Sequence, residues 1–137
     1  MLHHQPSDLE IRPDPDWPDW LKSEFEANQD NARVGTQLLP ESERVRVWHL
    51  SIKPGERLPV HRHVLDYFWT ALTPGRARSH YHDGRTVEAE YRPGETQHYR
   101  FGPGRFMMHD LENIGDTVLA FTTVEFLDSS NPPLTVD

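Results

Sequence analysis

The sequence predicts an all-β domain, an antiparallel sandwich or barrel, and three observations lead to this fold class. Short runs rich in aromatic and β-branched residues recur between turn sequences, at a spacing of roughly 8 to 12 residues. The chain of 137 residues contains 12 prolines and 8 glycines, so many turns must fit between short segments. No helical runs separate the strands in the way that parallel sheets require. One domain is expected, because domains typically contain about 100 to 150 residues.

Residues 1–35 are predicted to form an N-terminal arm and a short helix that packs on the barrel. The first 16 residues are polar and rich in proline, which favours irregular structure. From Trp17 onward the pattern changes, and Trp20, Leu21 and Phe25 recur at helical spacing. We expect these side chains to pack against the barrel or against a second subunit.

Residues 36–128 are predicted to form the barrel, and residues 129–137 a C-terminal tail. The segment 44–52 alternates in polarity, as half-buried strands do. Asp83-Gly84 is the strongest hairpin signal in the chain. The other expected strands cover residues 65–72, 76–82, 85–91, a run that ends at Phe101, 105–113 and 118–127.

Composition and charge exclude several classes of function. The formal net charge of -8 argues against nucleic acid or an anionic membrane as the main partner. The absence of cysteine excludes disulfides, thiolate metal sites and a cysteine nucleophile. The N-terminus lacks the apolar core of a signal peptide, and no run approaches the roughly 18 apolar residues of a membrane span. A cytoplasmic protein is therefore expected.

The segment PGERLPVHRH, residues 54–63, carries the main candidate site. On an extended strand His61 and His63 point to the same face, so both imidazoles can meet at one spot in the core. Neutral imidazoles suit a late first-row transition metal. His109 lies in a second strand-like run and is the candidate third ligand. The alternative is that the histidines are solvated or only hydrogen-bonded.

A second H-x-H, His80 and His82, lies in the predicted hairpin and shares a strand face with Arg76 and Arg78. We expect this face to be solvated and to bind no metal. The two H-x-H segments therefore have the same spacing but different predicted roles.

The first of these segments resembles the first motif of the cupin superfamily, in which a glycine, five residues and H-x-H are followed by a glutamate and a second glycine. Gly55 precedes His61 by five residues, and Gly75 ends the motif. His109 and Asn113 match the H-x-x-x-N that ends the second family motif, and Gly94 is the candidate for its first glycine.

The resemblance spans about residues 44–127 and implies a jelly-roll barrel, that is, a double-stranded β-helix. It also implies one divalent transition-metal ion, Fe, Zn, Ni, Mn or Cu, held by three histidines. These metal ligands are His61, His63 and His109. Asn113 is expected to stabilise the turn after His109.

The sequence departs from the family pattern at the position of the fourth ligand. Tyr67 and Phe68 stand where the family has glutamate. The nearest carboxylate, Asp66, has the wrong parity and reaches the metal only if a bulge turns it inward. His98 is an alternative additional ligand. The loop before His109 is also longer than the family pattern.

Other residues are candidates for the pocket around the metal. Tyr67 is the candidate acid or oxyanion partner, and the alternative is core packing with a satisfied hydroxyl. Four further residues are predicted either to line the pocket or to pack in the core: His49, Trp69, Phe106 and Met107.

These inferences favour a metalloenzyme that acts on a small anionic metabolite by dioxygenase or Lewis-acid chemistry. Without the glutamate the site is more cationic, which favours direct coordination of an anion. The alternative is a non-catalytic cupin barrel, either ligand-binding or structural. A metal-free epimerase-like barrel has less support, because it needs an acid and base pair. We also expect a homodimer that uses the N-terminal segment and an outer sheet face.

Overall fold

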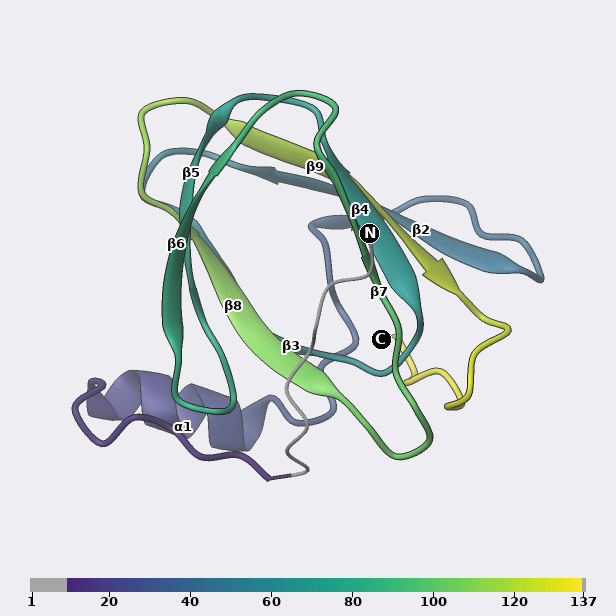
Figure 1. Ribbon diagram of the computed structural model, residues 1–137, viewed down its shortest axis with the longest axis horizontal. Helices are drawn as coiled ribbons and strands as arrows, with labels where there is room; N and C mark the ends of the chain where they lie inside the picture. Colours follow the sequence, from purple (N-terminus) through teal and green to yellow (C-terminus); the bar gives the residue numbers. More distant parts are fainter. Residues whose placement is uncertain (1–9, 137) are drawn as a thin grey trace.

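The structure, a computed structural model, describes residues 10–136 and consists of two antiparallel sheets that face each other (Figure 1). The five-stranded sheet has the order β1-β2-β9-β4-β7, and the four-stranded sheet has the order β3-β8-β5-β6. The elements are α1 (Asp19–Ala27), β1 (Gln37–Leu38), β2 (Val45–Ile52), β3 (Arg57–His63), β4 (Tyr67–Ala71), β5 (Gly75–His80), β6 (Thr86–Tyr91), β7 (Thr96–Tyr99), β8 (Met107–Asn113) and β9 (Leu119–Phe126). This confirms the all-β prediction.

Alternation along the strands puts one face of each sheet inside the barrel. In β2 every second residue is buried, ending with Leu50 and Ile52, whereas His49 lies on the opposite face. β9 alternates in the same way and pairs with β2 over its whole length. Apolar side chains from both sheets form the interior cluster of Leu50, Ile52, Leu58, Ala71, Ala77, Leu111, Leu119 and Phe121.

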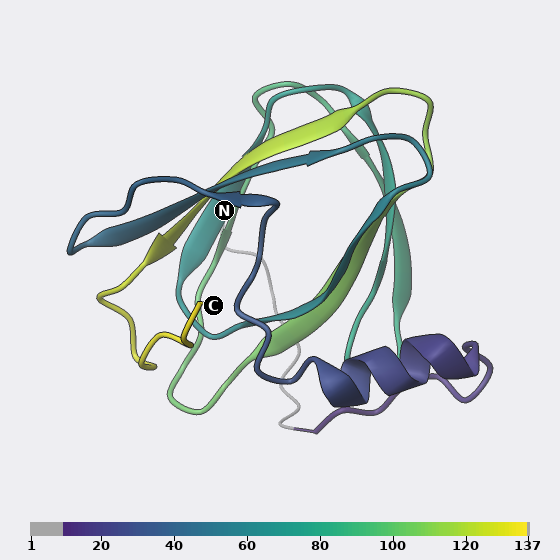
Figure 2. The same cartoon turned by 180° about the vertical axis from the view of Figure 1, so that it is seen from behind.

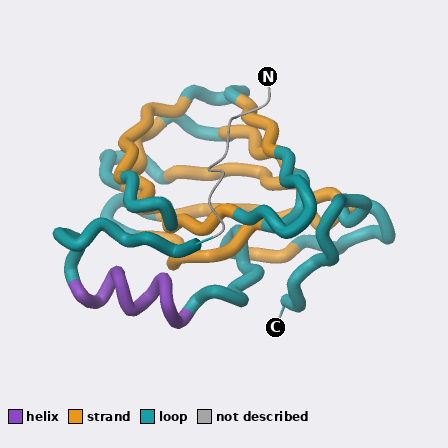
Figure 3. The backbone as a smooth tube through the Cα atoms, turned by 60° about the horizontal axis from the view of Figure 1, so that its bottom comes forward, coloured by secondary structure: helices purple, strands orange, loops and turns teal. Residues whose placement is uncertain are grey.

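Helix α1 lies outside the barrel, against the four-stranded sheet (Figures 2 and 3). Leu21 and Phe25, four residues apart on one helix face, are buried against Val60 and Met108. Trp20 falls just outside this apolar stripe and is 55% exposed, so it does not pack in the barrel, and its packing against a second subunit stays a prediction. Its ring instead contacts the Arg57 guanidinium at 4.9 Å.

The chain segments on either side of the barrel also pack on it. Arg12 N–H donates to the carbonyl of His82, and Asn131 Nδ2 donates to the carbonyl of Val64. Part of the predicted arm, residues 1–9, lies outside the described residues. Within residues 10–136, no helix has the length and apolar character needed to cross a bilayer.

The hairpin between β5 and β6 confirms the turn predicted at Asp83-Gly84, where Gly84 adopts φ +92°. The predicted solvated face is wrong, however, at His82, which is fully buried. The strand ends at His80, so His82 belongs to the turn that packs back on β8. There its Nδ1 accepts a hydrogen bond from Met108 N–H at 3.2 Å.

Candidate metal centre

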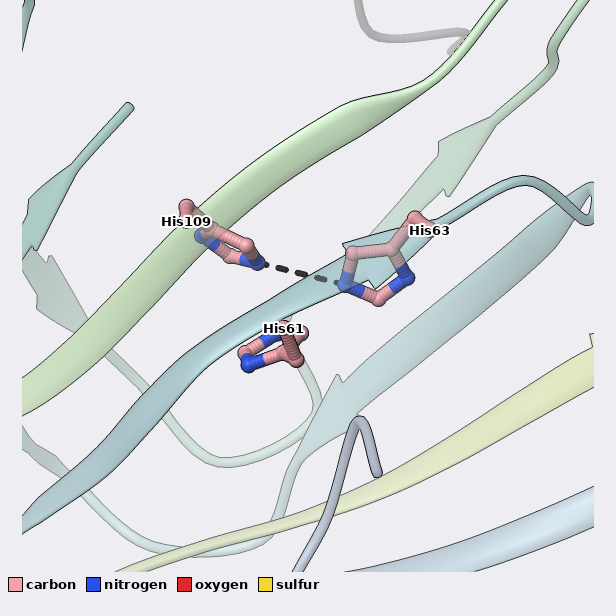
Figure 4. A group of neighbouring side chains, drawn as sticks. All are labelled: His61, His63 and His109. Carbon is pink, nitrogen blue, oxygen red and sulfur yellow. Dashed lines mark hydrogen bonds between the residues drawn. The ribbon is translucent and has the colours of Figure 1, made fainter. Parts of the chain in front are cut away.

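Strands β3 and β8 bring His61, His63 and His109 together. His61 and His109 are direct partners across the β3–β8 ladder, and His63 lies two residues further along β3. The three rings point toward one another inside the barrel (Figure 4). Each offers one ring nitrogen to a group whose nitrogens all lie within 4.8 Å of one another. Both β3 histidines are 2% exposed.

A β-bulge in β3 sets this orientation. Leu58 pairs with Leu111 but His61 pairs with His109, so β3 contains one residue more than β8 between these pairs. As a result Leu58 and His61 both face the interior although they are three residues apart. Val60, inside the bulge, packs under α1 instead.

The two glycines that begin the resembling motifs adopt backbone conformations that other residues rarely take. Gly55 has φ +84° and Gly94 has φ +88°, each in a turn before a strand. Asn113 fixes the turn after β8 as expected. Its side-chain amide donates to the carbonyls of Ile52 and Thr117 at 3.0 and 2.8 Å.

One pair of ring nitrogens has the spacing of two ligands on a shared metal ion. Nε2 of His63 and Nε2 of His109 are 3.2 Å apart and form a hydrogen bond in this structure (Figure 4). Two neighbouring nitrogens bound to one ion at about 2.0–2.1 Å lie about 2.9–3.4 Å apart in octahedral or tetrahedral geometry. His61 Nδ1 is 2.8 Å from the carbonyl oxygen of Pro59 and donates to it, so that Nε2 remains free to accept a metal. The donor set therefore matches a late first-row divalent metal.

Two further ring nitrogens of this group have no hydrogen-bond partner. Within residues 10–136, these are Nδ1 of His63 and Nδ1 of His109, and both atoms are buried. A buried imidazole with no partner for one nitrogen costs desolvation energy. If Nε2 of each ring binds a metal, Nδ1 carries the remaining proton and lacks the hydrogen-bond acceptor that metal-bound histidines usually have.

Burial keeps all three imidazoles neutral. It lowers the pKa of His61 to about 4, and it outweighs the opposing effects of the hydrogen bond to Pro59 and of the charges of Asp110 and Glu24. Burial also lowers the pKa values of His63 and His109 well below the ordinary value of 6.5, and the neighbouring histidines add to this effect. At neutral pH the rings are therefore in the unprotonated form that binds metals.

The histidines form part of the wall of a small cavity of about 60 Å³, roughly four times the ~15 Å³ that one water needs. Within the described chain, the residues that line it include no Asp, Glu, Lys or Arg. They are Val34, Leu50, Leu58, His61, His63, Tyr67, Trp69, Ser79, Tyr81, Tyr91, Tyr99, His109, Leu111, Phe121 and Thr123. The cavity is therefore aromatic and uncharged apart from any bound ion.

Tyrosine rings stack on the candidate ligands. Tyr67 lies parallel to His63 with a centroid distance of 4.1 Å, and Tyr99 stacks on Tyr67 at 4.6 Å. Tyr81 stacks on His109 at 5.2 Å. Burial raises the pKa of Tyr67 well above its ordinary value of 10 and raises that of Tyr81 as well. Both hydroxyls stay protonated at neutral pH and are suited to donating hydrogen bonds.

Tyr67 and Trp69 line the cavity, whereas the two additional ligand candidates do not. Asp66 Oδ1 accepts a hydrogen bond from Phe101 N–H at 2.8 Å. The bulge lies in β3, before Asp66, and does not turn this side chain inward. His98 is exposed and contacts Phe68 on the outer sheet face. Within residues 10–136 the metal-ligating group contains only the three imidazoles.

The prediction of pocket residues needs correction at three positions. His49 lies on the outer face of β2, because the inner face of that strand is occupied by its even-numbered residues. Phe106 packs in the cluster under α1, outside the barrel. Met107 is buried beside Tyr67 and Tyr99 but does not line the cavity among the residues described.

Sequence reasoning missed Tyr81, Tyr91 and Tyr99 as cavity residues. Tyr81 lies in the turn after β5, Tyr91 at the end of β6 and Tyr99 at the end of β7. No sequence motif marks these positions. Only the pairing of strands distant in sequence puts them opposite the histidines. For Tyr81 that pairing is an isolated bridge to His109.

Sequence reasoning also missed Glu125, which is 3% exposed inside the barrel. Trp48 Nε1 donates to Glu125 Oε1 at 2.7 Å, and Arg46 lies 3.9 Å from the same oxygen. Burial raises its pKa to about 7, partly opposed by these two partners. The signal was present in the sequence, since Glu125 shares the inward parity of Leu119 and Phe121.

No protein-family profile matches the chain, and no curated protein matches it. Solved structures do match. A cupin-domain protein from Bordetella pertussis Tohama I has a TM-score of 0.58 and 26% identity, over 66% of this chain and 88% of that chain. A protein from Bacillus halodurans has a TM-score of 0.53 and 19% identity, over 93% and 91%.

An RmlC-like cupin family protein from Methanocaldococcus jannaschii has a TM-score of 0.51 and 18% identity, over 69% of this chain and 84% of that chain. It is described as having a double-stranded β-helix fold, which agrees with the two facing antiparallel sheets found here. The chain is therefore a protein of the cupin fold, a double-stranded β-helix.

Proposed function

We propose that this protein binds one divalent transition-metal ion through His61, His63 and His109 and that it is a metalloenzyme acting on a small anionic metabolite. The observation that carries the proposal is the group of three neutral imidazoles, two of them buried and one partly buried, with two Nε2 atoms 3.2 Å apart, at the wall of a cavity. Fe, Zn, Ni, Mn and Cu all accept imidazole nitrogen.

The charge balance of the cavity supports an anionic ligand. Three neutral imidazoles leave both positive charges of a divalent ion uncompensated, and no carboxylate is found among the described cavity-lining residues. A bare charge in an apolar interior is costly. A ligand with a carboxylate or a similar anionic group offsets this cost by coordinating directly, and the cavity volume of about 60 Å³ limits it to few heavy atoms.

When bound, such an ion supplies Lewis acidity, or oxygenase chemistry if it is redox-active. The residues of the chain supply orientation and a dry environment. Tyr67 keeps its proton and lines the cavity, where its hydroxyl interacts with Tyr99, and it is the proposed hydrogen-bond donor to a substrate oxygen on which negative charge develops. The stacked rings of Tyr67 and Tyr99 form an apolar wall that excludes water.

A second candidate function, a non-catalytic ligand-binding or structural barrel, is favoured by one observation. The described cavity wall offers neutral imidazoles and protonated tyrosines but no carboxylate or lysine to act as a general base. Catalysis then depends wholly on the metal and the substrate. Oxygen uptake and turnover of small carboxylic acids by the metal-loaded protein distinguish the two functions.

We also propose a homodimer formed through the outer face of the five-stranded sheet. Phe126, 37% exposed, lies on that face with its ring centroid 6.0 Å from that of Phe68, and large exposed apolar groups favour a protein partner.

The net charge of -8 argues against nucleic acid and anionic membranes as partners. The cytoplasmic location stays a prediction from the sequence.

Elemental analysis of protein purified without an affinity tag or chelator tests the proposed metal site. We expect near one transition-metal ion per chain in the wild type and almost none in His109→Ala. If neither protein holds a metal after reconstitution with each candidate ion, the proposed function is wrong and a metal-free binding barrel replaces it.

A further inference from the structure

The bulge that aims His61 is held by the N-terminal helix. At Val60 the β3–β8 ladder is interrupted, and α1 with the residues after it supplies the hydrogen bonds of the backbone. Val60 N–H donates to Glu24 Oε2 at 2.9 Å. The carbonyl of Val60 accepts from Nδ2 of Asn28 and from Nδ2 of Asn31, both at 2.9 Å. Both polar groups of the bulged peptide are therefore satisfied from outside the sheet.

The same glutamate connects the helix to both strands that carry the candidate ligands. Arg57, on β3, donates to both carboxylate oxygens of Glu24 at 2.8 Å. It also donates to Asp110 Oδ2 at 2.7 Å, and Asp110 directly follows His109 on β8. Asp110 is fully buried and accepts a further hydrogen bond from His80 N–H at 2.7 Å.

The charges in this network are stable at neutral pH. Burial raises the pKa of Glu24, but hydrogen bonds from Arg57 and Val60 outweigh this effect, so that the pKa is lowered overall. For Asp110 burial again opposes ionisation, and hydrogen bonds from His80 and Arg57 outweigh it. Two carboxylates therefore remain ionised on the outer side of the wall whose inner side carries the imidazoles.

We propose that Glu24 and Asn28 are positioning residues for the metal centre, and that α1 acts as a clamp on the bulge. By holding Val60 the helix holds the preceding carbonyl of Pro59, which accepts the Nδ1 proton of His61 at 2.8 Å. This hydrogen bond selects the tautomer in which Nε2 faces the cavity as an acceptor. The inference rests on the proposed metal site for its function, but the orientation of His61 is measurable without metal.

Glu24→Gln is the most direct variant. The amide has the shape of the carboxylate but turns one acceptor into a donor, which then faces either Arg57 or Val60 N–H. Glu26→Gln is the matched control, since Glu26 is exposed on the same helix. Asn28→Asp is the second variant. It removes a donor to the Val60 carbonyl and puts an acceptor in its place.

The first readout is the nitrogen NMR spectrum of the imidazoles in metal-free protein, which reports the tautomer of each ring. We expect His61 to hold its proton on Nδ1 in the wild type and in Glu26→Gln. In Glu24→Gln and Asn28→Asp we expect the two tautomers to be mixed. Circular dichroism at the same temperature shows whether each variant is folded.

The second readout is the dissociation constant for Zn²⁺, measured by competition with a chromophoric chelator. We expect it to rise about 10-fold or more in Glu24→Gln and Asn28→Asp, the lower range for residues that orient a metal ligand, and to stay unchanged in Glu26→Gln. Folded variants with the wild-type tautomer and wild-type affinity overturn the clamp. If the wild type binds no Zn²⁺ while the tautomer shifts in both variants, the clamp is supported and the proposed function fails.

Discussion

The two H-x-H segments of this protein have the same spacing and opposite orientations. In β3, His61 and His63 point into the barrel, and the residue between them, Arg62, contacts Phe106 outside it at 4.0 Å. At the end of β5 the middle residue, Tyr81, lines the cavity. The flanking His80 and His82 lie on the outer side instead, where they contact Trp17 and Phe106.

The difference shows that the environment of a histidine pair, and not its spacing, decides its role. The first pair lies in a strand whose bulge turns both imidazoles toward His109, in a cavity with no described charged lining residue. The second pair crosses the end of a strand. Its His80 Nδ1 is 3.0 Å from the carboxylate of Asp110, which already hydrogen-bonds Arg57. The first pair is suited to a metal and the second to structural hydrogen bonds.

The largest effect is expected when the two pairs are compared by substitution. His61→Ala should reduce the metal content from near one ion per chain to almost none, because only two imidazoles remain. His80→Ala should leave it near one, because His80 is on the other side of the wall. Elemental analysis of both folded variants checks this. Equal metal loss in the two variants would break the comparison.

A loss of stability is expected next, at Asp110, the buried carboxylate behind the second pair. Asp110→Asn should lower the free energy of unfolding by about 1–3 kcal/mol, because the buried side chain loses its charge-assisted hydrogen bonds to Arg57 and His80, although Arg57 keeps Glu24 as its second partner. The pKa of Asp110 is lowered from its ordinary value of 3.8, so its stabilisation is complete above pH 3.8 and is lost as the pH falls through the lowered pKa.

Urea unfolding of wild type and Asp110→Asn between pH 3 and pH 7 measures this difference. It should be largest at pH 7 and should narrow below about pH 3.8. A difference that is the same at every pH would mean that the ionisation of Asp110 does not contribute.

Glu125, inside the barrel, should show the opposite dependence on pH. It is the strand partner of Tyr67, and its pKa is raised from 4.5 to about 7. The folded state therefore binds the proton more tightly than the unfolded state does, and stability should fall as the pH rises from 4.5 through 7. The expected loss is about 3 kcal/mol.

Glu125→Gln should remove this dependence, because an amide does not titrate in this pH range. The fold should tolerate the change, since the amide oxygen still accepts the hydrogen bond from Trp48. The measurement is urea unfolding of both proteins at pH 5 and pH 8. Parallel losses of stability in the two proteins would assign the effect to another group.

The smallest effects are expected at the candidates that the structure leaves outside the site. Asp66→Asn should keep the metal, and its side-chain oxygen still accepts from Phe101 N–H. His98→Ala should also keep the metal, because His98 is exposed on the outer sheet face. Thermal melting and metal content should both stay close to wild type. A loss of metal in either variant would show a fourth ligand that reaches the ion by rearrangement.

Much of this contrast was predictable where it depends on local pattern. Alternation along β3 and β4 predicted that His61, His63 and Tyr67 share a face that excludes Asp66. Asp83-Gly84 predicted its hairpin, and Gly84 adopts the positive φ that closes the loop between Tyr81 and Arg85. The group of three histidines followed from the family motifs.

The rest depends on where strands and helices end and on what pairs with them. His82 is buried because β5 ends at His80, and strand ends are poorly marked in sequence. The bulge at Val60 is stabilised by Glu24, which is distant in sequence. The sequence of its helix predicts only an amphipathic helix that covers the barrel. Tyr81 enters the cavity through a bridge to His109, which no local pattern encodes.

X-ray absorption at the metal edge of the reconstituted protein tests the central claim most directly, since it counts the imidazoles around the ion. The account predicts three imidazole nitrogens at about 2.0–2.1 Å for Zn²⁺, with the remaining positions filled by oxygen ligands. It also predicts two imidazoles in His61→Ala with any residual ion and three in His80→Ala. A wild-type spectrum with one imidazole or none, or one that changes in His80→Ala, would contradict the account.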